Sequence, residues 1–333
     1  MEFLADYGTF LAKFLTVVII LVIIAGAALI IIMKSKAGVD GHLNITNINQ
    51  RFDDMKLVLQ SQILQKSEFK KLLKEYKQKH KKGTKKSGDE ESRKRIYVID
   101  FKGDIRASEV SSLREEITAI LTITRPQDEV LARVESAGGT VHGYGLAASQ
   151  LKRIRDRKIS LTVAVDKVAA SGGYMMACVG SRIIAAPFAI IGSVGVLAQI
   201  PNFNRLLEKH DIDFEQFAAG KYKRTLSLFG KNTDEQRQKM QEELRETHEL
   251  FKVFIRENRG QVDIDAIATG EHWYGTQALE LKLVDKLQTS DDYLCEASDN
   301  ADIYEIDYVR KKSLPEKFFS VGTRLLDQVR YSE

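Results

Sequence analysis

Hydrophobic positions change their spacing along the chain, and each change predicts a different element. Apolar runs rich in β-branched side chains at residues 96–101, 130–134 and 159–165 are typical of buried parallel strands. Apolar positions at helical intervals lie between these runs, at residues 109–121 and 144–157. This alternation predicts an α/β fold with a parallel sheet and right-handed crossovers.

The pattern becomes less regular in the C-terminal half. A long uncharged run at residues 183–200 has the composition of a membrane span, but Pro187, Gly192 and Gly195 interrupt it, so we interpret it as core strands and turns. The elements predicted after it are a helix at 204–210, a short strand at 214–218, a long charged helix at 233–258, a strand at 301–309 and an amphipathic helix at 314–329.

The N-terminal segment has a different pattern. Residues 14–33 are twenty positions without a charge, bounded by Lys13 and Lys34, which is enough to cross the hydrocarbon core of a bilayer as a helix. A cleaved signal peptide is the alternative, but the apolar run continues past the small residues at 25–27 and the N-terminus is acidic. We therefore predict one transmembrane anchor. The lysines that follow the span favour a cytoplasmic position for the rest of the chain, but this charge bias is small and large domains cross membranes regardless of charge, so the side stays open.

A basic region follows the predicted anchor. Residues 49–76 carry apolar positions at helical intervals, which favours an amphipathic or coiled-coil stalk. Residues 66–95 hold thirteen Lys or Arg against five Asp or Glu, although the whole chain has a net charge of only +4. Few aromatic residues accompany the lysines, so we expect proximity to anionic lipid rather than binding to nucleic acid.

These patterns divide the chain into four parts. With 333 residues, 44% of them hydrophobic, the chain can bury a core of ordinary size. The predicted parts are a membrane anchor at 1–34, an amphipathic and lysine-rich linker at 35–94, a catalytic domain at 95–290, and a C-terminal strand with an amphipathic helix at 291–333.

Candidate chemistry centres on Ser171, which falls where a predicted strand gives way to a helix. Backbone N–H groups at the start of a helix favour negative charge, and Gly172 and Gly173 let a substrate approach closely. The alternative interpretation is a small-residue turn in which Ser171 caps the helix. The glycine pair Gly138 and Gly139 follows another predicted strand, so its N–H groups could join the same sheet edge as oxyanion donors.

A nucleophilic serine needs a base, and several residues are candidates. A lysine can act as the base where it is buried and neutral, and Lys221 and Lys223 lie in one short basic segment that could equally be a solvated loop. Histidine is the usual base, and His142 is the histidine rival because it lies close to Gly139. No metal-ligand spacing is present, and two cysteines outside any CxxC motif give no disulfide framework. We expect neither a metal nor another cofactor.

Five segments together resemble the signal peptide peptidase A family of membrane serine proteases, and in particular a branch with an N-terminal membrane segment. These segments are residues 136–139, 168–177, 191–196, 219–223 and 270–285. The resemblance covers roughly residues 95–290. It departs from the family pattern at Ala137, where proline is common, and at Lys282, where glycine is common. Neither position belongs to the reacting groups.

The resemblance implies a fold, a mechanism and an assembly. The fold would be a ClpP/crotonase-like spiral of parallel strands and helices. The enzyme would be a serine endopeptidase of the bacterial inner membrane that acts on peptides such as residual signal peptides, with its catalytic body favoured on the periplasmic side. The implied site residues are Ser171 as nucleophile, Lys223 as base, Gly172 with Gly138 or Gly139 as oxyanion donors, and Ser193 as a hydrogen-bond partner of the lysine.

Relatives with a single copy of these motifs form homo-oligomeric rings, so the resemblance implies that Lys223 acts on Ser171 of a neighbouring subunit. Two alternatives from other classes are a non-catalytic scaffold on the membrane and a crotonase that stabilises a thioester enolate. The second lacks any adenine or pantetheine signature in the sequence.

Overall fold

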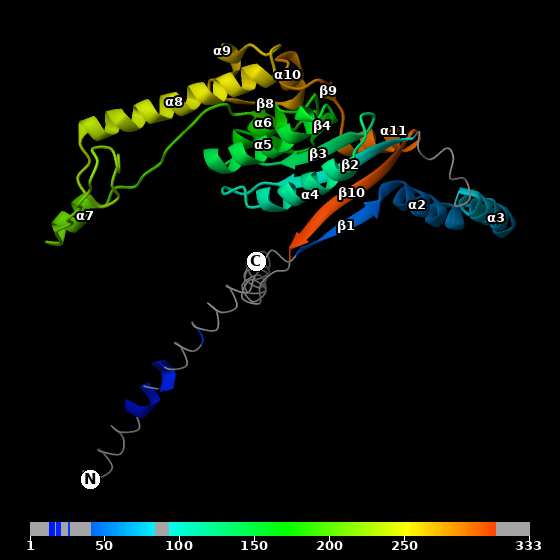
Figure 1. Ribbon diagram of the computed structural model, residues 1–333, viewed down its shortest axis with the longest axis horizontal. Coiled ribbons are helices and arrows are strands. Elements are labelled where there is room, and N and C mark those ends of the chain that lie inside the picture. Colours follow the sequence, from blue (N-terminus) through cyan, green and yellow to red (C-terminus); the bar gives the residue numbers. More distant parts are fainter. Residues whose placement is uncertain (1–12, 17, 21–25, 27–40, 84–92, 311–333) are drawn as a thin grey trace, which may run out of the picture. The chain divides into compact units, whose positions relative to one another are not determined.

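The computed structural model describes residues 13–16, 18–20, 26, 41–83 and 93–310 (Figure 1). Two compact units are present, one of Asn44–Asp307 and one that combines Met1–Leu43 with Tyr308–Glu333. Most of the predicted anchor at 14–33 and all of the predicted helix at 314–329 lie outside the described residues. Among the residues that are described, no helix combines the length and the apolar character needed to cross a membrane.

The larger unit is built on parallel strands (Figure 1). The main sheet has the order β1-β10-β2-β3-β4-β6-β9, and every pair from β10 to β9 is parallel. A second sheet has the order β5-β7-β8, with β5 and β7 parallel and β8 antiparallel to β7. The strands are β1 (Gly41–Asn47), β2 (Lys94–Lys102), β3 (Glu129–Glu135), β4 (Ser160–Val165), β5 (Val168–Ala170), β6 (Arg182–Ala185), β7 (Ile190–Gly192), β8 (His272–Tyr274), β9 (Lys286–Leu287) and β10 (Ala301–Arg310).

The helices connect these strands and cover both faces of the main sheet. They are α2 (Ile48–Ile63), α3 (Lys66–Gly83), α4 (Val110–Ile123), α5 (Val141–Asp156), α6 (Gly172–Ala177), α7 (Asn204–Lys209), α8 (Asp234–Asn258), α9 (Ile264–Ile267), α10 (Gly275–Glu280) and α11 (Ser290–Ser298). The fold is therefore a mixed α/β fold with a parallel sheet, as the alternation of strands and helices predicted.

Both faces of the central strands are buried. In β2 the side chains alternate: Tyr97 and Ile99 pack into the larger core with α4, α5 and α6, while Ile96 and Val98 pack into a second core with α2 and α11. Successive side chains of a strand point to opposite faces, so a strand buried on both sides needs an unbroken apolar run. That requirement explains why these strands were recognisable from composition alone.

The structure confirms most predicted elements and corrects two. The helical pattern at 49–76 forms two helices, α2 and α3, rather than one. The extended backbone of Leu64 ends α2 and separates it from α3. The predicted strand at 214–218 is absent, because this segment has no neighbouring strand to pair with and Phe217 is 89% exposed. Local β-propensity does not hold a strand without a partner.

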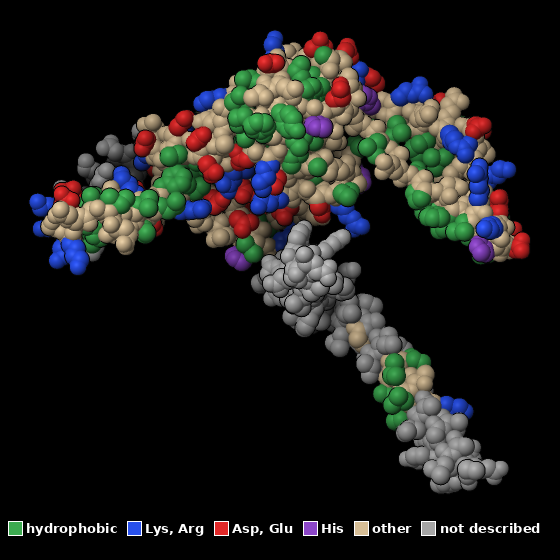
Figure 2. All heavy atoms as spheres, turned by 180° about the vertical axis from the view of Figure 1, so that it is seen from behind, with side chains coloured by type: hydrophobic (Ala, Val, Ile, Leu, Met, Phe, Trp, Pro, Cys, Tyr) green, Lys and Arg blue, Asp and Glu red, His purple; other side chains and the backbone are tan. Residues whose placement is uncertain are grey.

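A long connection between β7 and α8, residues 193–233, carries α7 (Figure 1). We call residues 197–232 the α7 segment. Hydrophobic side chains are visible on its surface (Figure 2), and Leu197, Phe203, Ile212 and Phe217 are all more than 40% exposed. An exposed apolar surface of this kind is typical of a segment that contacts another molecule.

Candidate active site

Ser171 occupies the turn between β5 and α6, as predicted. Its backbone is in an unusual conformation, with φ 52° and ψ −118°. Its N–H donates to the carbonyl of Gly192 at 2.7 Å, and its carbonyl accepts from the N–H of Met175 at 2.9 Å. Such backbone strain costs about 1–3 kcal/mol and persists only where surrounding bonds impose it. The Ser171 hydroxyl has no hydrogen-bond partner among the described residues, so the helix-cap interpretation is wrong.

Two glycines after Ser171 allow neighbouring groups to approach the start of α6. A Cβ on Gly172 would lie 2.4 Å from Cγ of Tyr144, and a Cβ on Gly173 would lie 2.4 Å from the carbonyl oxygen of Ser136. Only glycine fits at both positions without displacing buried groups. The glycine pair is therefore required by packing around Ser171, in addition to any role in substrate binding.

The loop that carries Gly138 and Gly139 is fastened to the turn that carries Ser171. The N–H of Ser136 donates to the carbonyl of Val168 at 2.9 Å, and the N–H of Ala170 donates back to the carbonyl of Ser136 at 3.0 Å. Gly138 has φ 92°, and a Cβ there would lie 2.7 Å from the backbone nitrogen of Gly172. The two loops thus lie side by side at one end of the parallel strands, where such sheets place their sites.

A series of hydrogen-bonded hydroxyl groups connects the Gly138 loop to the core. The Gly138 N–H donates to Ser136 Oγ at 3.0 Å, Ser136 Oγ and the Tyr144 hydroxyl are 2.5 Å apart, and the Tyr144 hydroxyl donates to the carbonyl of Asp104 at 2.7 Å. Burial raises the pKa of Tyr144, so its hydroxyl remains a donor near neutral pH. The Gly138 N–H is therefore already hydrogen-bonded within the protein.

Two other N–H groups beside Ser171 have no hydrogen-bond acceptor among the described residues. Neither the Gly172 N–H nor the Gly139 N–H has a hydrogen-bond acceptor among the described residues. A Cβ on Gly139 would lie 2.1 Å from the carbonyl oxygen of Ile105, so only glycine fits there as well. Of the two glycines predicted as the second oxyanion donor, the hydrogen bonding favours Gly139.

These groups line one cavity of about 770 Å³. Its lining includes five of the six predicted site residues, namely Ser171, Gly172, Gly138, Gly139 and Ser193. The remaining lining is mostly apolar, with Ile105, Val141, Met175, Val196, Leu197 and Phe251, and no Asp, Glu, Lys or Arg of the described residues lines the cavity. Ser193, like Ser171, has a positive φ, of 52°, and its N–H donates to the carbonyl of Glu271 at 2.6 Å.

Lys223, the sixth predicted residue, does not line this cavity. It lies in a turn of the α7 segment, where its N–H donates to the carbonyl of Gly220 at 3.1 Å and its side chain is exposed. Nearby Lys221 pairs with Glu235 at 2.7 Å. Within one subunit the structure therefore separates Lys223 from the Ser171 cavity.

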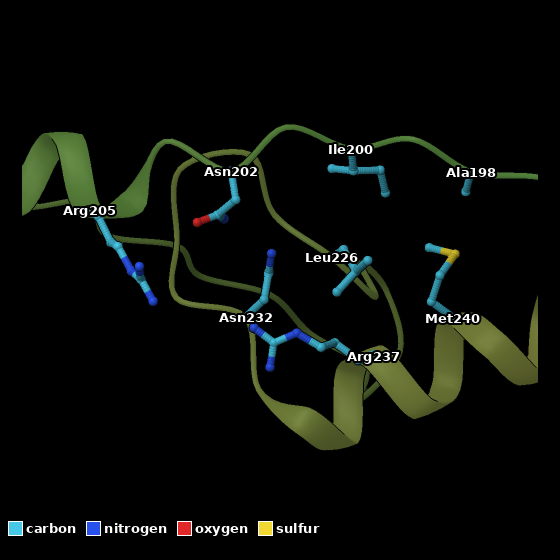
Figure 3. Close-up of a pocket in the computed structure, with 8 residues that line it drawn as sticks. All are labelled: Ala198, Ile200, Asn202, Arg205, Leu226, Asn232, Arg237 and Met240. Carbon is cyan, nitrogen blue, oxygen red and sulfur yellow. The ribbon is translucent and has the colours of Figure 1, made fainter.

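A second cavity, of about 510 Å³, lies between the α7 segment and the start of α8 (Figure 3). Arg205, Asn202, Asn232 and Arg237 lie toward one end, and Ile200, Leu226 and Met240 lie toward the other (Figure 3). Both asparagine side chains are used internally, because each donates to the carbonyl of Ser227. None of the predicted site residues lines this cavity.

The histidine in the Ser171 cavity is His248 of α8, not the predicted rival His142. His142 is exposed and does not line the cavity. The signal for His248 was its spacing: Phe251 and Ile255 are three and seven positions further along α8 and are both buried, which places all three on the inward face. Neither histidine has a hydrogen bond to Ser171.

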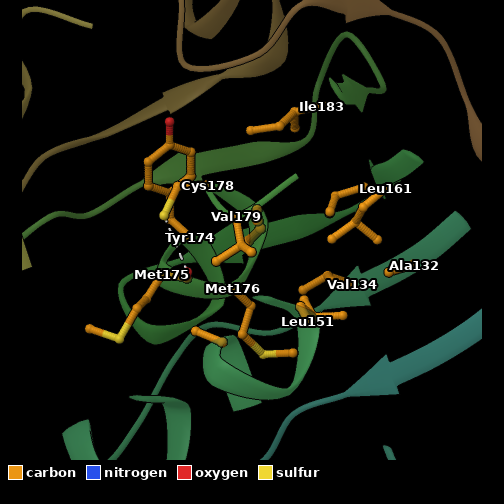
Figure 4. Packing of buried hydrophobic residues seen from close by; sticks show 14 of the residues in the cluster. Ala132, Val134, Leu151, Leu161, Tyr174, Met175, Met176, Cys178, Val179 and Ile183 are labelled. Carbon is orange, nitrogen blue, oxygen red and sulfur yellow. Dashed lines mark hydrogen bonds between the residues drawn. The ribbon is translucent and has the colours of Figure 1, made fainter. Parts of the chain in front are cut away.

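Buried hydrophobic residues pack behind α6, the helix that follows Ser171 (Figure 4). Met176 and Val179 pack among Leu151, Leu161 and Ile183 in this cluster (Figure 4). Burial raises the pKa of the Cys178 thiol to about 12. Cys178 is therefore a protonated, buried thiol at neutral pH and not a competing nucleophile.

The last motif segment, residues 270–285, ends in a structural ion pair. Arg259 is 3% exposed and donates to both carboxylate oxygens of Asp285, at 2.8 and 2.9 Å. Burial acts to raise the pKa of Asp285, but hydrogen bonds from Arg259 and from the N–H of Ile183 lower it overall. The described residues contain no group of three or more His, Cys, Asp or Glu that could hold a metal ion.

Comparisons with known proteins identify the family of this chain. Residues 2–151 match the model of the Peptidase family S49 N-terminal region, and residues 153–304 match that of Peptidase family S49. The "Probable protease SohB" of Haemophilus influenzae is 47% identical over 328 residues, which cover 95% of this chain and 92% of the relative. The protein of the same name from Buchnera aphidicola subsp. Schizaphis graminum is 46% identical and covers 96% of this chain and 94% of the relative.

A solved structure is also similar, at 14% identity. It is a mutant of the 1510-N membrane-bound stomatin-specific protease in complex with a substrate peptide, with a TM-score of 0.43 and coverage of 70% of this chain and 99% of that one. The sequence matches cover most of the chain. The chain therefore belongs to peptidase family S49 and is a serine peptidase.

Proposed function

We propose that this serine peptidase is an endopeptidase in which Ser171 is the nucleophile. The observation that carries the proposal is the state of Ser171, whose hydroxyl is unpaired, sits on a strained turn and faces a cavity with two unpaired N–H groups. Oγ of Ser171 attacks the scissile carbonyl, and the N–H groups of Gly172 and Gly139 stabilise the oxyanion that forms. Each such donor contributes about 3–4 kcal/mol to transition-state stabilisation.

The base is Lys223 of a neighbouring subunit. A neutral Lys223 takes the proton from Ser171 as Oγ attacks, and returns it to the leaving amine as the peptide bond breaks. Water then repeats the sequence on the acyl-enzyme. The neutral form of an amine is favoured where the ammonium group loses its water, and Lys223 is exposed in a single subunit, so a second subunit has to cover it. Ser193, in the same cavity as Ser171, would orient the lysine.

The α7 segment supports this assembly. It carries Lys223 and also exposes Leu197, Phe203 and Phe217, whose burial in water-free contacts would favour association. We propose a homo-oligomeric ring in which each α7 segment completes the site of the next subunit, on a ClpP/crotonase-like spiral fold.

The lining of the Ser171 cavity suggests the class of substrate, and the N-terminal sequence suggests the location of the enzyme. The mostly apolar cavity suits extended peptides with small or apolar side chains, such as residual signal peptides or membrane-proximal segments. The uncharged run at 14–33 would anchor the enzyme in the inner membrane with one span, with the peptidase body on the periplasmic side and the basic linker near anionic lipid. The proposal needs no metal, cofactor or nucleic acid.

A mixing experiment tests the shared site. Ser171→Ala and Lys223→Ala should each abolish peptide cleavage without changing the melting temperature, and a mixture of the two variants should recover part of the activity. Lys221→Ala is the matched control, because Lys221 lies two positions away and pairs with Glu235 on the surface. Near-full activity of Lys223→Ala would exclude Lys223 as the base. Inactive single variants without recovery on mixing would contradict a site shared between subunits.

A further inference from the structure

Helix α2 carries a group of apolar side chains that the sheet does not cover. At the start of the helix, Ile48 is 3% exposed and Phe52 packs against the second core. Further along, four positions spaced as on one face of a helix are apolar and more than half exposed, namely Met55, Val58, Leu59 and Ile63. We call these four residues the α2 face. Exposed apolar side chains that are grouped in this way are typical of a contact surface.

The α2 face borders a groove of about 750 Å³. The apolar residues that line this groove are Met55, Val58 and Leu59 of the face and Ile45 of β1, which is 60% exposed. The polar lining residues are Thr46, Asn47, Gln50, Arg51 and Asp54. No described residue lines both this groove and the Ser171 cavity. The groove therefore offers apolar contact to a molecule other than the substrate.

A strongly basic helix follows α2 directly. Only Leu64 and Gln65 separate the end of α2 from the start of α3. The sequence of α3 has eight Lys and two Glu, so its formal net charge is +6 with His80 neutral. Four of its lysines are exposed, namely Lys66, Lys70, Lys71 and Lys74. The α2 face and a group of cations are therefore neighbours in one short stretch of the chain.

An anionic lipid surface fits both features. Amphipathic helices at a membrane surface insert apolar side chains at the boundary between headgroups and acyl chains, and their lysines favour anionic headgroups. A second copy of this surface is disfavoured as the occupant, because it would bring two α3 helices of like charge together. Residues 34–47 connect the uncharged run at 14–33 to α2, and these fourteen residues span at most about 50 Å. A membrane crossed by that run is therefore within reach of α2.

We propose that α2 lies in the interface of an anionic membrane, with the α2 face among the acyl chains and the α3 lysines at the lipid phosphates. This inference rests on the proposed function, in which residues 14–33 anchor the protein in the membrane. It goes beyond the attraction of a basic linker to anionic lipid, because attraction between charges alone would leave the α2 face in water. The two situations differ in the surroundings of Leu59, which are acyl chains in the first and solvent in the second.

A fluorescent probe at Leu59 tests the inference in the full-length protein. Leu59→Cys is labelled with a polarity-sensitive fluorophore in a Cys295→Ser background, where the remaining Cys178 is buried. The protein is reconstituted into vesicles of phosphatidylcholine alone or of an equimolar mixture with phosphatidylglycerol, each with spin-labelled acyl chains. In the anionic vesicles the probe emission should shift to the blue and be quenched by the spin label. Replacing Lys70 and Lys71 with Gln should lower the equilibrium constant for insertion by about fivefold per lysine.

Matched probes and one further variant serve as controls. Leu250→Cys is the surface control, because Leu250 is 71% exposed on α8, and its probe should not be quenched in either kind of vesicle. A probe at Val18, within the predicted anchor, should be quenched in both kinds. Val58→Asp places a charge on the α2 face and should remove the quenching at Leu59, because a charge is costly among acyl chains. Cleavage of a soluble peptide should be unchanged in this variant.

The outcomes separate this inference from the proposed function. Quenching at Val18 without quenching at Leu59 would overturn the inference and leave the membrane anchor standing. A Leu59 probe that is shielded equally in detergent and in both kinds of vesicle would also overturn it, and would assign the α2 face to a contact between proteins. Lack of quenching at both positions would overturn the inference and the anchor together.

Discussion

The N–H of Gly138 donates to Ser136 Oγ at 3.0 Å, whereas the N–H of Gly139 has no acceptor among the described residues. Adjacent glycines in one loop thus have different roles. Gly138 fixes the loop against the core through Ser136, and this bond holds the Gly139 N–H at the edge of the Ser171 cavity. An oxyanion donor is effective when it is held in place before the reaction, so the buried hydroxyl matters for catalysis although it does not touch the substrate.

Replacing Ser136 with Ala tests this positioning role. The change removes the acceptor of the partly buried Gly138 N–H, which should lower the free energy of unfolding by about 1 kcal/mol and lower kcat more than it changes KM. Ser149→Ala is the matched control, because that exposed hydroxyl only bonds to the carbonyl of Gly145 within α5. Steady-state kinetics with chemical denaturation measures both effects. Unaltered kcat in Ser136→Ala would contradict the role.

Gly172→Ala should damage the protein through a steric clash. The added Cβ would lie 2.4 Å from Cγ of fully buried Tyr144, so α6 must move away from α5 and carry Ser171 with it. We expect a loss of about 1–3 kcal/mol in unfolding free energy and loss of most activity.

Gly145→Ala provides the opposite case within the same region. A Cβ there meets nothing within 4 Å, and alanine is favoured over glycine in a helix, so this variant should be stabilised by up to about 1 kcal/mol with normal kinetics. Thermal unfolding of the two variants distinguishes them. A stable, active Gly172→Ala would show that the contact with Tyr144 does not constrain the turn.

Asp285→Asn should destabilise the fold in a pH-dependent way. Arg259 would remain buried without its carboxylate, at a cost of about 3 kcal/mol, toward the low end for buried pairs because the Asp285 side chain is 32% exposed. The folded-state pKa of Asp285 is lowered, so its contribution is complete above its unfolded value of about 3.9 and is lost as the pH falls through the folded value. The difference between wild type and variant should therefore shrink only below about pH 4.

The control for this ion pair is Glu249→Gln. Glu249 is 64% exposed and pairs with Lys252 on the surface of α8, so its loss should cost less than about 0.5 kcal/mol. Urea unfolding at several pH values gives both comparisons. An Asp285→Asn effect as small as that of Glu249→Gln would mean that the Arg259 pair adds nothing to stability.

The two cysteines should react differently with alkylating reagents. Cys178 is buried with its pKa raised to about 12, whereas Cys295 is exposed. Iodoacetamide at neutral pH should modify Cys295 of the native protein, leave Cys178 intact and leave peptide cleavage unchanged. Peptide mapping by mass spectrometry reads out both sites. Modification of native Cys178 would show that the core behind α6 opens to solvent.

Much of the fold and the position of Ser171 could be predicted because their signals are local. Strands buried on both faces, such as β2, need an unbroken apolar run, and the turn at Ser171 needs glycine directly after it. The partner of an N–H group is not a local property. Gly138 and Gly139 were equivalent in the sequence, and only the buried position of Ser136 distinguishes them.

The histidines show the same limit. His142 was favoured by its closeness to Gly139 in the sequence, but it lies on an exposed side of α5. His248 is distant in the sequence and reaches the cavity because Phe251 and Ile255 bury that face of α8. The prediction of a strand at 214–218 was wrong for a related reason, because a strand needs a neighbouring strand and composition does not reveal one.

Labelling with a fluorophosphonate tests the central claim most directly, because the reagent forms a covalent bond only with an activated serine. The full-length protein should be labelled, the phosphonyl group should map to Ser171 by mass spectrometry, and peptide cleavage should stop in proportion to labelling. Equal labelling of Ser171→Ala, or a label on any other serine, Ser193 included, would contradict the account.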